Sequence, residues 1–190
     1  MKVVLATASP YRIEAMKFTG IDFEAKSSNV EEYFDGRPNH PEELVKHLSK
    51  LKAEAVAKDR QDSLVIGFDS VGFFDGKILE KPKSYEEAFK RLKKLSGQKH
   101  DFYTGITLIN TKTNEIHQEV VLTRVEFREI NEKEIKYYLG EDSDYNTYAL
   151  GYDPLGHSSS TFIKKIEGDP NNLLRGIPLS KIVEMIKSRK

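Results

Sequence analysis

The chain has 190 residues, enough for one domain or for two lobes that share a core, and it can bury a substantial interior. Its 30 Lys and Arg residues balance 30 Asp and Glu residues, so no overall field draws it to nucleic acid or to an anionic membrane. The absence of cysteine excludes a disulfide framework, a thiolate nucleophile and a Cys-ligated metal site. We find no signal peptide and no transmembrane run, and we therefore expect a cytoplasmic protein.

The N-terminal region predicts a strand, a helix and a second strand. Lys2 to Ala6 is a short apolar run of the kind that forms a buried strand. Helical spacing follows from Pro10 to Phe18, with Ser9 as the expected N-cap and Pro10 at the first helical position. Ile21 to Lys26 is expected to form another short strand.

A long helix and a buried strand are predicted next. Glu42 to Lys58 places its apolar residues along one side, and Leu64 to Gly67 is a continuous apolar run. The segment Val71 to Leu79 contains Asp75-Gly76 between apolar arms, which is a hairpin signal.

The middle of the chain predicts one helix followed by two strands. Ser84 and Glu87 have the spacing of a capping box at the start of a helix that runs to about Leu95. Phe102 to Asn110 and Glu115 to Glu129 are rich in β-forming residues, and the second segment alternates apolar with polar side chains.

The C-terminal part completes an alternation of strands and helices. Asn131 is expected to cap a short helix, and the polar, aromatic stretch Glu141 to Ser160 is expected to be a long loop of functional importance. A last strand is expected over Thr161 to Ile166 and a last helix over Pro178 to Lys187. The sequence predicts a single α/β domain over residues 1–190. We expect a mixed, strongly twisted sheet flanked by helices, with two lobes around a central cleft.

The stretch "LATASPYRIEAM" is the first candidate site, because Thr7, Ser9 and Arg12 lie where a strand leads into a helix. The start of a helix has free backbone N–H groups and a positive dipole end, both of which favour phosphate. Arg12 could add a bidentate clamp on the same anion. Alternatively, Ser9 only caps the helix and Arg12 pairs with Glu14 or with solvent.

Asp69 is the second candidate, since it directly follows the apolar strand that begins at Leu64. The carboxyl ends of strands line the ligand crevice in open α/β sheets, so a carboxylate there could hold a metal or a water molecule. A carboxylate at a strand end can also be a helix cap or a turn former. No obvious helix begins at Ser70, which weakens that alternative.

Two lysines and an acidic pair could complete the site. Lys52 lies close to the apolar side of its helix, where a buried stem must find an anion at its tip. Pro82 biases Lys81 to an extended backbone and so gives its side chain a defined direction. Glu31 and Glu32, together with Asp69, could form an oxygen-rich Mg²⁺ site. Taken singly, such lysines and loop carboxylates are usually surface groups in solvent.

Several function classes lack their motifs. The sequence has no P-loop, no dinucleotide-binding glycine motif and no esterase elbow, and its five histidines lack the spacing of a metal site. A nucleic-acid-binding protein is disfavoured by the neutral net charge and by the absence of a basic stripe.

Taken together, these segments resemble the Maf family, which is related to the inosine-triphosphatase-like pyrophosphatases. The resemblance covers nearly the whole chain, and its motifs occur in the order and spacing of the family. The matching segments are "LATASPYR", "KAEAVA", "VIGFDSV", "ILEKP", "EEAFKRLKKLSGQKHDFYTGITLI", "TRVEF" and "IEGDPNNLLRGIPL".

The resemblance implies an enzyme that hydrolyses a nucleoside triphosphate between its α and β phosphates, with Mg²⁺ or another divalent cation. By position, Asp69 resembles the catalytic acceptor that activates water or holds the metal, and Glu32 resembles an acidic loop residue. Thr7, Ser9 and Arg12 fall in the phosphate-binding loop. Lys52 and Lys81 resemble the phosphate lysines of the family.

This chain departs from the family pattern at positions that bear on the choice of base. Tyr11 stands where the family has the first of two arginines, and Ser70 replaces a threonine. The segment "YALGYDPLG" lacks an expected glutamine and resembles the base-contact segment of the inosine-triphosphatase branch. There Asp153 could bond to a base edge and Tyr152 could stack on the base, although Asp153-Pro154 could equally form a turn.

Two hypotheses of different classes follow. The first is a nucleoside triphosphate pyrophosphatase that removes non-standard or modified nucleotides from the pool. The alternative is a nucleotide-binding regulator of cell division, without turnover, because the Maf name is attached to inhibition of septum formation. The only partner expected besides the nucleotide is a second copy of the chain, as a homodimer.

Overall fold

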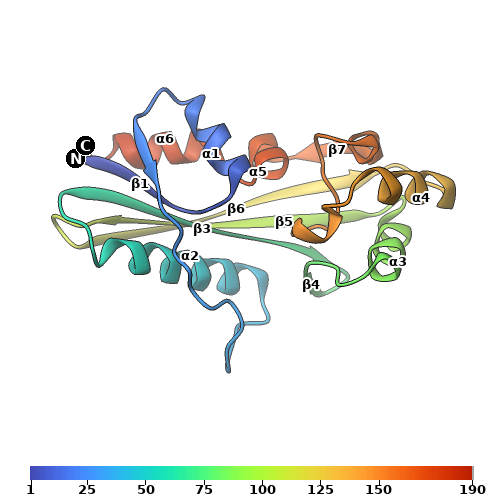
Figure 1. Cartoon of the computed structure of the whole chain (residues 1–190), viewed down its shortest axis with the longest axis horizontal. Helices are drawn as coiled ribbons and strands as arrows, with labels where there is room; N and C mark the ends of the chain where they lie inside the picture. Colours follow the sequence, from blue (N-terminus) through green and yellow to red (C-terminus); the bar gives the residue numbers. More distant parts are fainter. Residues whose placement is uncertain (190) are drawn as a thin grey trace. The chain divides into compact units, whose positions relative to one another are not determined.

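The computed structural model describes residues 1–189, which form a sheet with helices on both of its faces (Figure 1). Residues 145–147 and 158–162 form short 3₁₀ helices. The strands are β1 (Lys2–Ala6), β2 (Phe23–Ala25), β3 (Ser63–Phe74), β4 (Lys77–Leu79), β5 (Lys99–Asn110), β6 (Glu115–Phe127) and β7 (Ile163–Glu167). The α-helices are α1 (Pro10–Lys17), α2 (Pro41–Ala57), α3 (Tyr85–Leu95), α4 (Glu132–Glu141), α5 (Pro170–Arg175) and α6 (Leu179–Lys187).

The sheet has seven strands and is mixed, which confirms the predicted fold class. Its order is β2-β1-β3-β5-β6-β7, and β4 pairs with β3 outside this path. β1 runs parallel to β2 and to β3, whereas β4 runs antiparallel to β3 and β7 antiparallel to β6. Ala6, the last residue of β1, pairs with Gly67 in the middle of β3. The longer strand β3 therefore continues beyond the point where β1 leads into α1.

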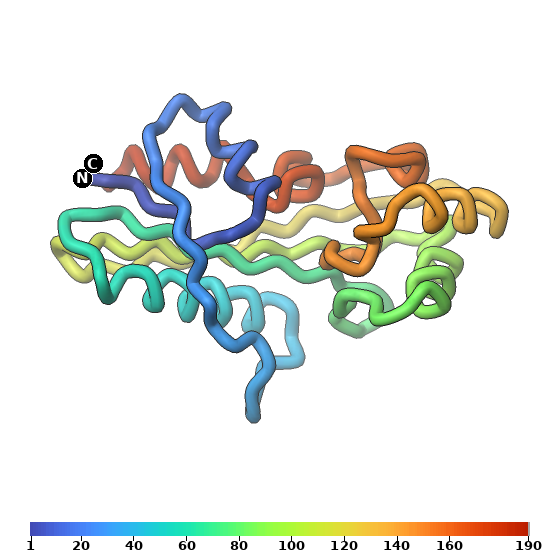
Figure 2. The backbone as a smooth tube through the Cα atoms, in the orientation of Figure 1, coloured from blue at the N-terminus to red at the C-terminus, as the bar shows by residue number. Residues whose placement is uncertain are grey.

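The chain divides into two compact units, and it passes between them several times (Figure 2). Unit 1 comprises residues 1–70, 103–121 and 175–190, and unit 2 comprises residues 71–102 and 122–174. Each unit has its own apolar cluster. The cluster of unit 1 joins residues of β1 and β3 to α1 and α6, which lie on one face of the sheet, opposite α2 (Figure 1).

Helix α2 packs against its face of unit 1 unusually closely, because glycines lie beneath it. A Cβ atom on Gly67 would lie 2.2 Å from the carbonyl oxygen of Ser49, and one on Gly105 would lie 2.2 Å from that of Val45. Side chains cannot occupy such positions, so glycine at both sites lets the helix backbone touch the sheet. This contact fixes the height of α2, and hence of Lys52, above β3.

The core of unit 2 contains a buried histidine among aromatic rings. His100 Nε2 lies 2.9 Å from the Tyr152 hydroxyl, and its ring meets that of Phe127 edge to face at a centroid distance of 4.9 Å. Burial lowers the pKa of His100 to about 4. The imidazole is therefore neutral at physiological pH.

Most of the expected elements are confirmed, with three differences. β3 does not end near Gly67 but continues to Phe74, so Asp69 lies within a strand rather than after one. Ser84 accepts a hydrogen bond from the Glu87 amide as expected, but the Glu87 carboxylate accepts from Lys83 N and does not close a capping box. Helix α5 was not expected at all, because six residues are too few to show helical periodicity.

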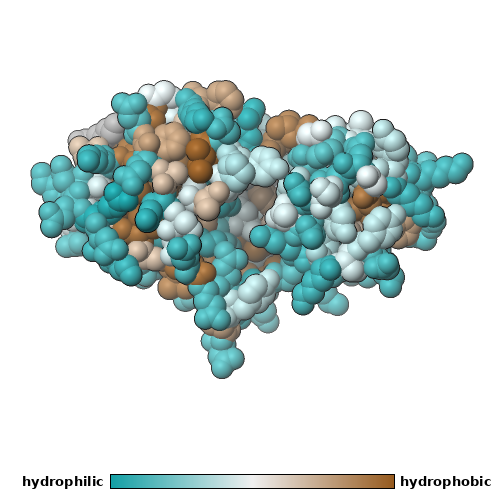
Figure 3. Space-filling view, in the orientation of Figure 1, coloured by the Kyte–Doolittle hydropathy of each residue, from teal (hydrophilic) through white to brown (hydrophobic). Residues whose placement is uncertain are grey.

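The visible surface is mostly polar. Hydrophilic side chains cover most of the face in Figure 3, with smaller apolar patches among them. None of the helices within residues 1–189 combines the length and the apolar character needed to cross a bilayer.

Candidate functional site

Asp69, Lys52 and Glu32 form a charged cluster in unit 1, as the sequence predicts. Lys52 Nζ from α2 lies 2.7 Å from Asp69 Oδ1 and 2.6 Å from Glu32 Oε1. The side chains of Asp69 and Lys52 are 8% and 13% exposed, whereas that of Glu32 is 44% exposed. One ammonium group thus joins a buried strand carboxylate to a loop carboxylate that solvent can reach.

The protonation of Asp69 depends on a balance between burial and charge. Burial raises the pKa of Asp69, and the adjacent Lys52 ammonium opposes this effect. The Glu32 carboxylate raises the pKa further, and Arg12 lowers it. A buried carboxylate whose pKa is raised but whose charge is supported by one lysine is suited to accept a proton from a bound water molecule.

Arg12 is held rigidly by groups far from it in the sequence. Its Nε donates to the Gly176 carbonyl at 2.8 Å, and one terminal nitrogen donates to Ser70 Oγ at 2.7 Å. The guanidinium also lies over the Phe68 ring, 5.5 Å from its centroid. The remaining N–H donors of this half-buried group are available to a ligand. The alternative, in which Arg12 pairs with Glu14 or with solvent, is not what the structure shows, because Glu14 is paired with Lys17 and Arg12 is bonded to Gly176 and Ser70.

Arg12 and the carboxylates lie within electrostatic range of one another. Burial lowers the pKa of Arg12, and the charges of Asp69 and Glu32 raise it. An arginine remains protonated under these conditions. Unit 1 therefore presents fixed cations and carboxylates together, which is the arrangement that a polyphosphate and its counter-cation require.

The loop before α1 has the expected geometry. Ser9 is the N-cap and Pro10 the first helical residue, and Ser9 Oγ accepts from Arg12 N at 3.5 Å. Ser9 N donates to the hydroxyl of Thr7, a residue that is 7% exposed. Tyr11, for which a role in the choice of base is expected, is 49% exposed. Its part in the choice of base stays a prediction.

The donor set fits a hard divalent cation. Asp69 and Glu32 offer carboxylate oxygens, which are the protein ligands that Mg²⁺ prefers. Mg²⁺ commonly takes its other ligands from water and from substrate phosphates. Within residues 1–189 no group of three or more His, Asp or Glu side chains could hold a metal ion by itself. These two carboxylates suit a cation that arrives with its substrate better than one that is bound permanently.

The other predicted residues belong to unit 2. Lys81 is exposed and precedes the buried Pro82. Tyr152 is 0% exposed, with its hydroxyl on His100, so the stacking role expected for it does not fit this placement. Asp153 Oδ1 accepts from Leu155 N at 2.9 Å, which is the turn considered as the alternative. Its Oδ2 lies 3.2 Å from His157 Nδ1.

Two residues of the hydrogen-bond network around Arg12 were not expected from the sequence. Gly176 contributes only its carbonyl oxygen, and Thr104 lies 2.7 Å from Ser70, hydroxyl to hydroxyl. A carbonyl acceptor has no sequence signature, and a single threonine in a β-rich segment is typical of any strand. Ser70 accepts a hydrogen bond from Arg12, and its part in the choice of base stays a prediction.

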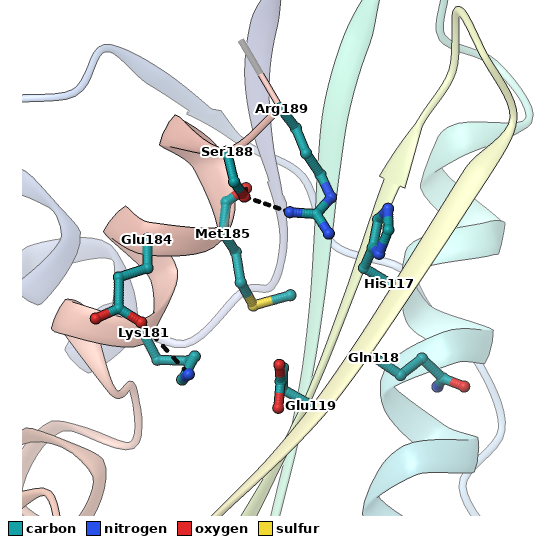
Figure 4. A pocket seen from close by; sticks show the side chains of 8 residues that line it. All are labelled: His117, Gln118, Glu119, Lys181, Glu184, Met185, Ser188 and Arg189. Carbon is teal, nitrogen blue, oxygen red and sulfur yellow. Dashed lines mark hydrogen bonds and ion pairs between the residues drawn. The ribbon is translucent and has the colours of Figure 1, made fainter.

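A hollow of about 280 Å³ lies elsewhere in unit 1, between β6 and α6 (Figure 4). Its lining includes His117 and Glu119 from the strand and Lys181 and Glu184 from the helix. Lys181 and Glu184 are paired with each other at 3.4 Å. None of the predicted site residues lines it, and its mixed charges favour no particular ligand.

Comparisons with known proteins show which family the chain belongs to. Relatives include the dTTP/UTP pyrophosphatase of Thermoanaerobacter sp. (strain X514), 37% identical over 98% of this chain and 96% of its own length. That of Syntrophus aciditrophicus (strain SB) is 40% identical over 98% of this chain and 89% of its own. The solved Staphylococcus aureus Ham1 protein shares the fold, with a TM-score of 0.58, 17% identity and full coverage of both chains. Because the family model described as Maf-like protein matches residues 2–189, the chain belongs to the Maf-like proteins.

Proposed function

We propose that the protein is a nucleoside triphosphate pyrophosphatase, which converts a triphosphate to the monophosphate and pyrophosphate. One observation supports this most directly. The buried Asp69 carboxylate is bonded to Lys52 and lies within electrostatic range of the fixed Arg12 guanidinium. Cations to hold phosphates and a carboxylate to accept a proton are the groups that this hydrolysis needs.

Each residue of the cluster has a distinct role in this proposal. Asp69 accepts the proton of the water that attacks the α-phosphorus, and pyrophosphate leaves as the bond to the α–β bridging oxygen breaks. Arg12, with the loop at Thr7 and Ser9, binds phosphate oxygens. Lys52 holds Asp69 in its ionised form. A divalent cation, when held by Asp69 and Glu32, would neutralise phosphate charge.

The substrates to test first are dTTP and UTP, because the relatives are named as dTTP/UTP pyrophosphatases. A preference for non-standard or modified nucleotides also stays a prediction, as does a role for Asp153 in the choice of base. The substitutions at Tyr11 and Ser70 give reason to compare bases directly.

The test is release of pyrophosphate from a panel of standard and modified triphosphates, by the wild type and by Asp69→Asn. We expect at least one triphosphate to be hydrolysed, and the substitution to lower kcat by about a hundredfold or more, the usual scale for a general base. Unchanged turnover by Asp69→Asn would remove Asp69 from its role. Binding of triphosphates without turnover at any metal concentration would favour the regulator of cell division, which the named relatives do not favour.

Three further expectations belong with this proposal. Lys81→Met in unit 2 is expected to weaken triphosphate binding, which a titration with a non-hydrolysable analogue measures. A location in the cytoplasm and a homodimer are expected as well. Sedimentation of the purified chain tests whether it is a homodimer.

A further inference from the structure

The hydroxyl of Ser70 has two neighbours that together fix where its own proton points. Arg12 donates one N–H to Ser70 Oγ at 2.7 Å, and Thr104 Oγ1 lies 2.7 Å from the same atom. A guanidinium has donors only, so Ser70 must be the acceptor in the first contact. The second contact can in principle run in either direction.

Burial decides the direction of the second hydrogen bond. Thr104 is 0% exposed, and within residues 1–189 its hydroxyl has no hydrogen-bond partner other than Ser70 Oγ. A buried O–H group without an acceptor is costly, and water cannot reach this one. Thr104 therefore donates its proton to Ser70. Both lone pairs of Ser70 Oγ are then occupied, and the proton of Ser70 is left over.

That remaining proton lies beside the unused donors of Arg12, on a residue that is only half-buried. We propose that the Ser70 hydroxyl donates a hydrogen bond to a phosphate oxygen held by Arg12, and that Thr104 is the positioning residue that orients it. The choice of phosphate as the ligand rests on the function proposed above. The direction of the hydrogen bonds rests on the structure alone.

The hydrogen bonds from Thr104 to Ser70 and from Ser70 to the ligand can be tested by a double-mutant cycle. Inorganic pyrophosphate is the probe, and its binding is measured by calorimetry. Ser70→Ala is expected to weaken binding by roughly ten- to a hundredfold, because it removes a donor to an anion and an acceptor of Arg12. Thr104→Val is expected to weaken it by roughly tenfold, since the serine hydroxyl loses its orientation. Thr104→Ser should restore wild-type binding. In the Ser70→Ala background, Thr104→Val should have no further effect.

Thr107→Val is the matched control. Thr107 lies in the same strand and is equally buried, and its hydroxyl is hydrogen-bonded to Ser49 and Gln118 rather than to Ser70. We expect this variant to bind pyrophosphate like the wild type, with all variants checked for folding by thermal unfolding. Equal weakening by Thr107→Val, or an undiminished effect of Thr104→Val in the Ser70→Ala background, would show a general packing effect and overturn the proposal.

Failure of this proposal can be told apart from failure of the proposed function. If the wild type hydrolyses triphosphates but Thr104→Val binds pyrophosphate as the wild type does, the positioning role of Thr104 is wrong and the proposed enzymatic function is unaffected. If no triphosphate is hydrolysed while the cycle behaves as expected, the phosphate contact stands without the enzyme. A wild type that does not bind pyrophosphate at all would overturn the proposal.

Discussion

Lys52 joins the two carboxylates of the candidate site, and the charge state of Asp69 depends on it. The ammonium lies within 2.7 Å of Asp69 and opposes the effect of burial on the pKa of that carboxyl. The lysine stem lies against the apolar side of α2, so the charge is delivered to a place that solvent scarcely reaches. At this scale the site is a buried carboxylate whose pKa is raised by burial and lowered by the charge of the Lys52 ammonium.

Lys52→Met is expected to move the acid limb of the pH profile of kcat/KM. Asp69 must be ionised to accept a proton, and activity falls as the pH drops through its raised pKa. Without the lysine charge this pKa rises further, so the limb moves to higher pH. Lys50→Met is the control, because Lys50 lies on the same helix but pairs with Glu54 at 3.7 Å and is 45% exposed. An acid limb that stays in place in Lys52→Met would contradict the assignment.

His100 makes the stability of unit 2 depend on pH. Its pKa is about 4 in the folded protein, against 6.5 as the ordinary value, so the unfolded chain takes up the proton first. Above pH 6.5 His100 is mostly neutral in both states and lowers the free energy of unfolding little. The free energy of unfolding then decreases as the pH falls toward 4. We expect urea unfolding to show a loss of about 2 kcal/mol between pH 7 and pH 5, and His100→Gln to lack this part of the loss. The same pH dependence in His100→Gln would place its origin in other groups.

At the scale of elements, the contact of α2 with the sheet sets the geometry of the site. Gly67 and Gly105 let the helix backbone touch the strands, and Lys52 projects from that helix toward Asp69. A helix at the usual distance above a sheet would hold the lysine farther from the carboxylate. The two glycines thus serve the charge pair as well as the packing.

Gly105→Ala is expected to lower the free energy of unfolding by about 3 kcal/mol, because the new Cβ would clash with the Val45 carbonyl. Gly140→Ala is the matched control. Gly140 lies in helix α4, and a Cβ added there would meet no neighbouring group within 4 Å, so alanine should stabilise by about 0.5–1 kcal/mol. Urea unfolding measures both, and a neutral Gly105→Ala would contradict the close packing.

Local chemistry explains which elements could be predicted from the sequence. Ser9 with Pro10, and the turn at Asp75-Gly76, are determined by neighbouring residues, and both were predicted correctly. Lys52, Asp69 and Glu32 were also predicted to belong together. The continuity of β3 through Asp69 and Ser70 was not, since polar residues there interrupt the apolar run, although the end of the strand pairs with β4 in the predicted hairpin. Nor were Thr104 and Gly176, which matter only through what they touch.

At the scale of the whole molecule, we expect the fold to form without a bound metal ion. Each unit has its own apolar cluster, and in the described part of the chain the site carboxylates are already paired with Lys52. Charge neutralisation by lysine takes the place that a structural cation would have in a metal-dependent fold.

Removal of divalent cations with EDTA is therefore expected to stop pyrophosphate release and to leave the thermal midpoint within about 2 °C of the untreated value, a shift below what 1 kcal/mol produces. Re-addition of Mg²⁺ should restore turnover. A large drop in the midpoint would show that a metal ion supports the fold after all.

The bond from Arg12 to the Gly176 carbonyl joins residues 164 positions apart. During synthesis the arginine emerges from the ribosome early, and its acceptor is among the last residues to follow. A chain that terminates before Gly176 lacks this acceptor, so Arg12 gains its full set of hydrogen bonds only when nearly the whole chain has been synthesised.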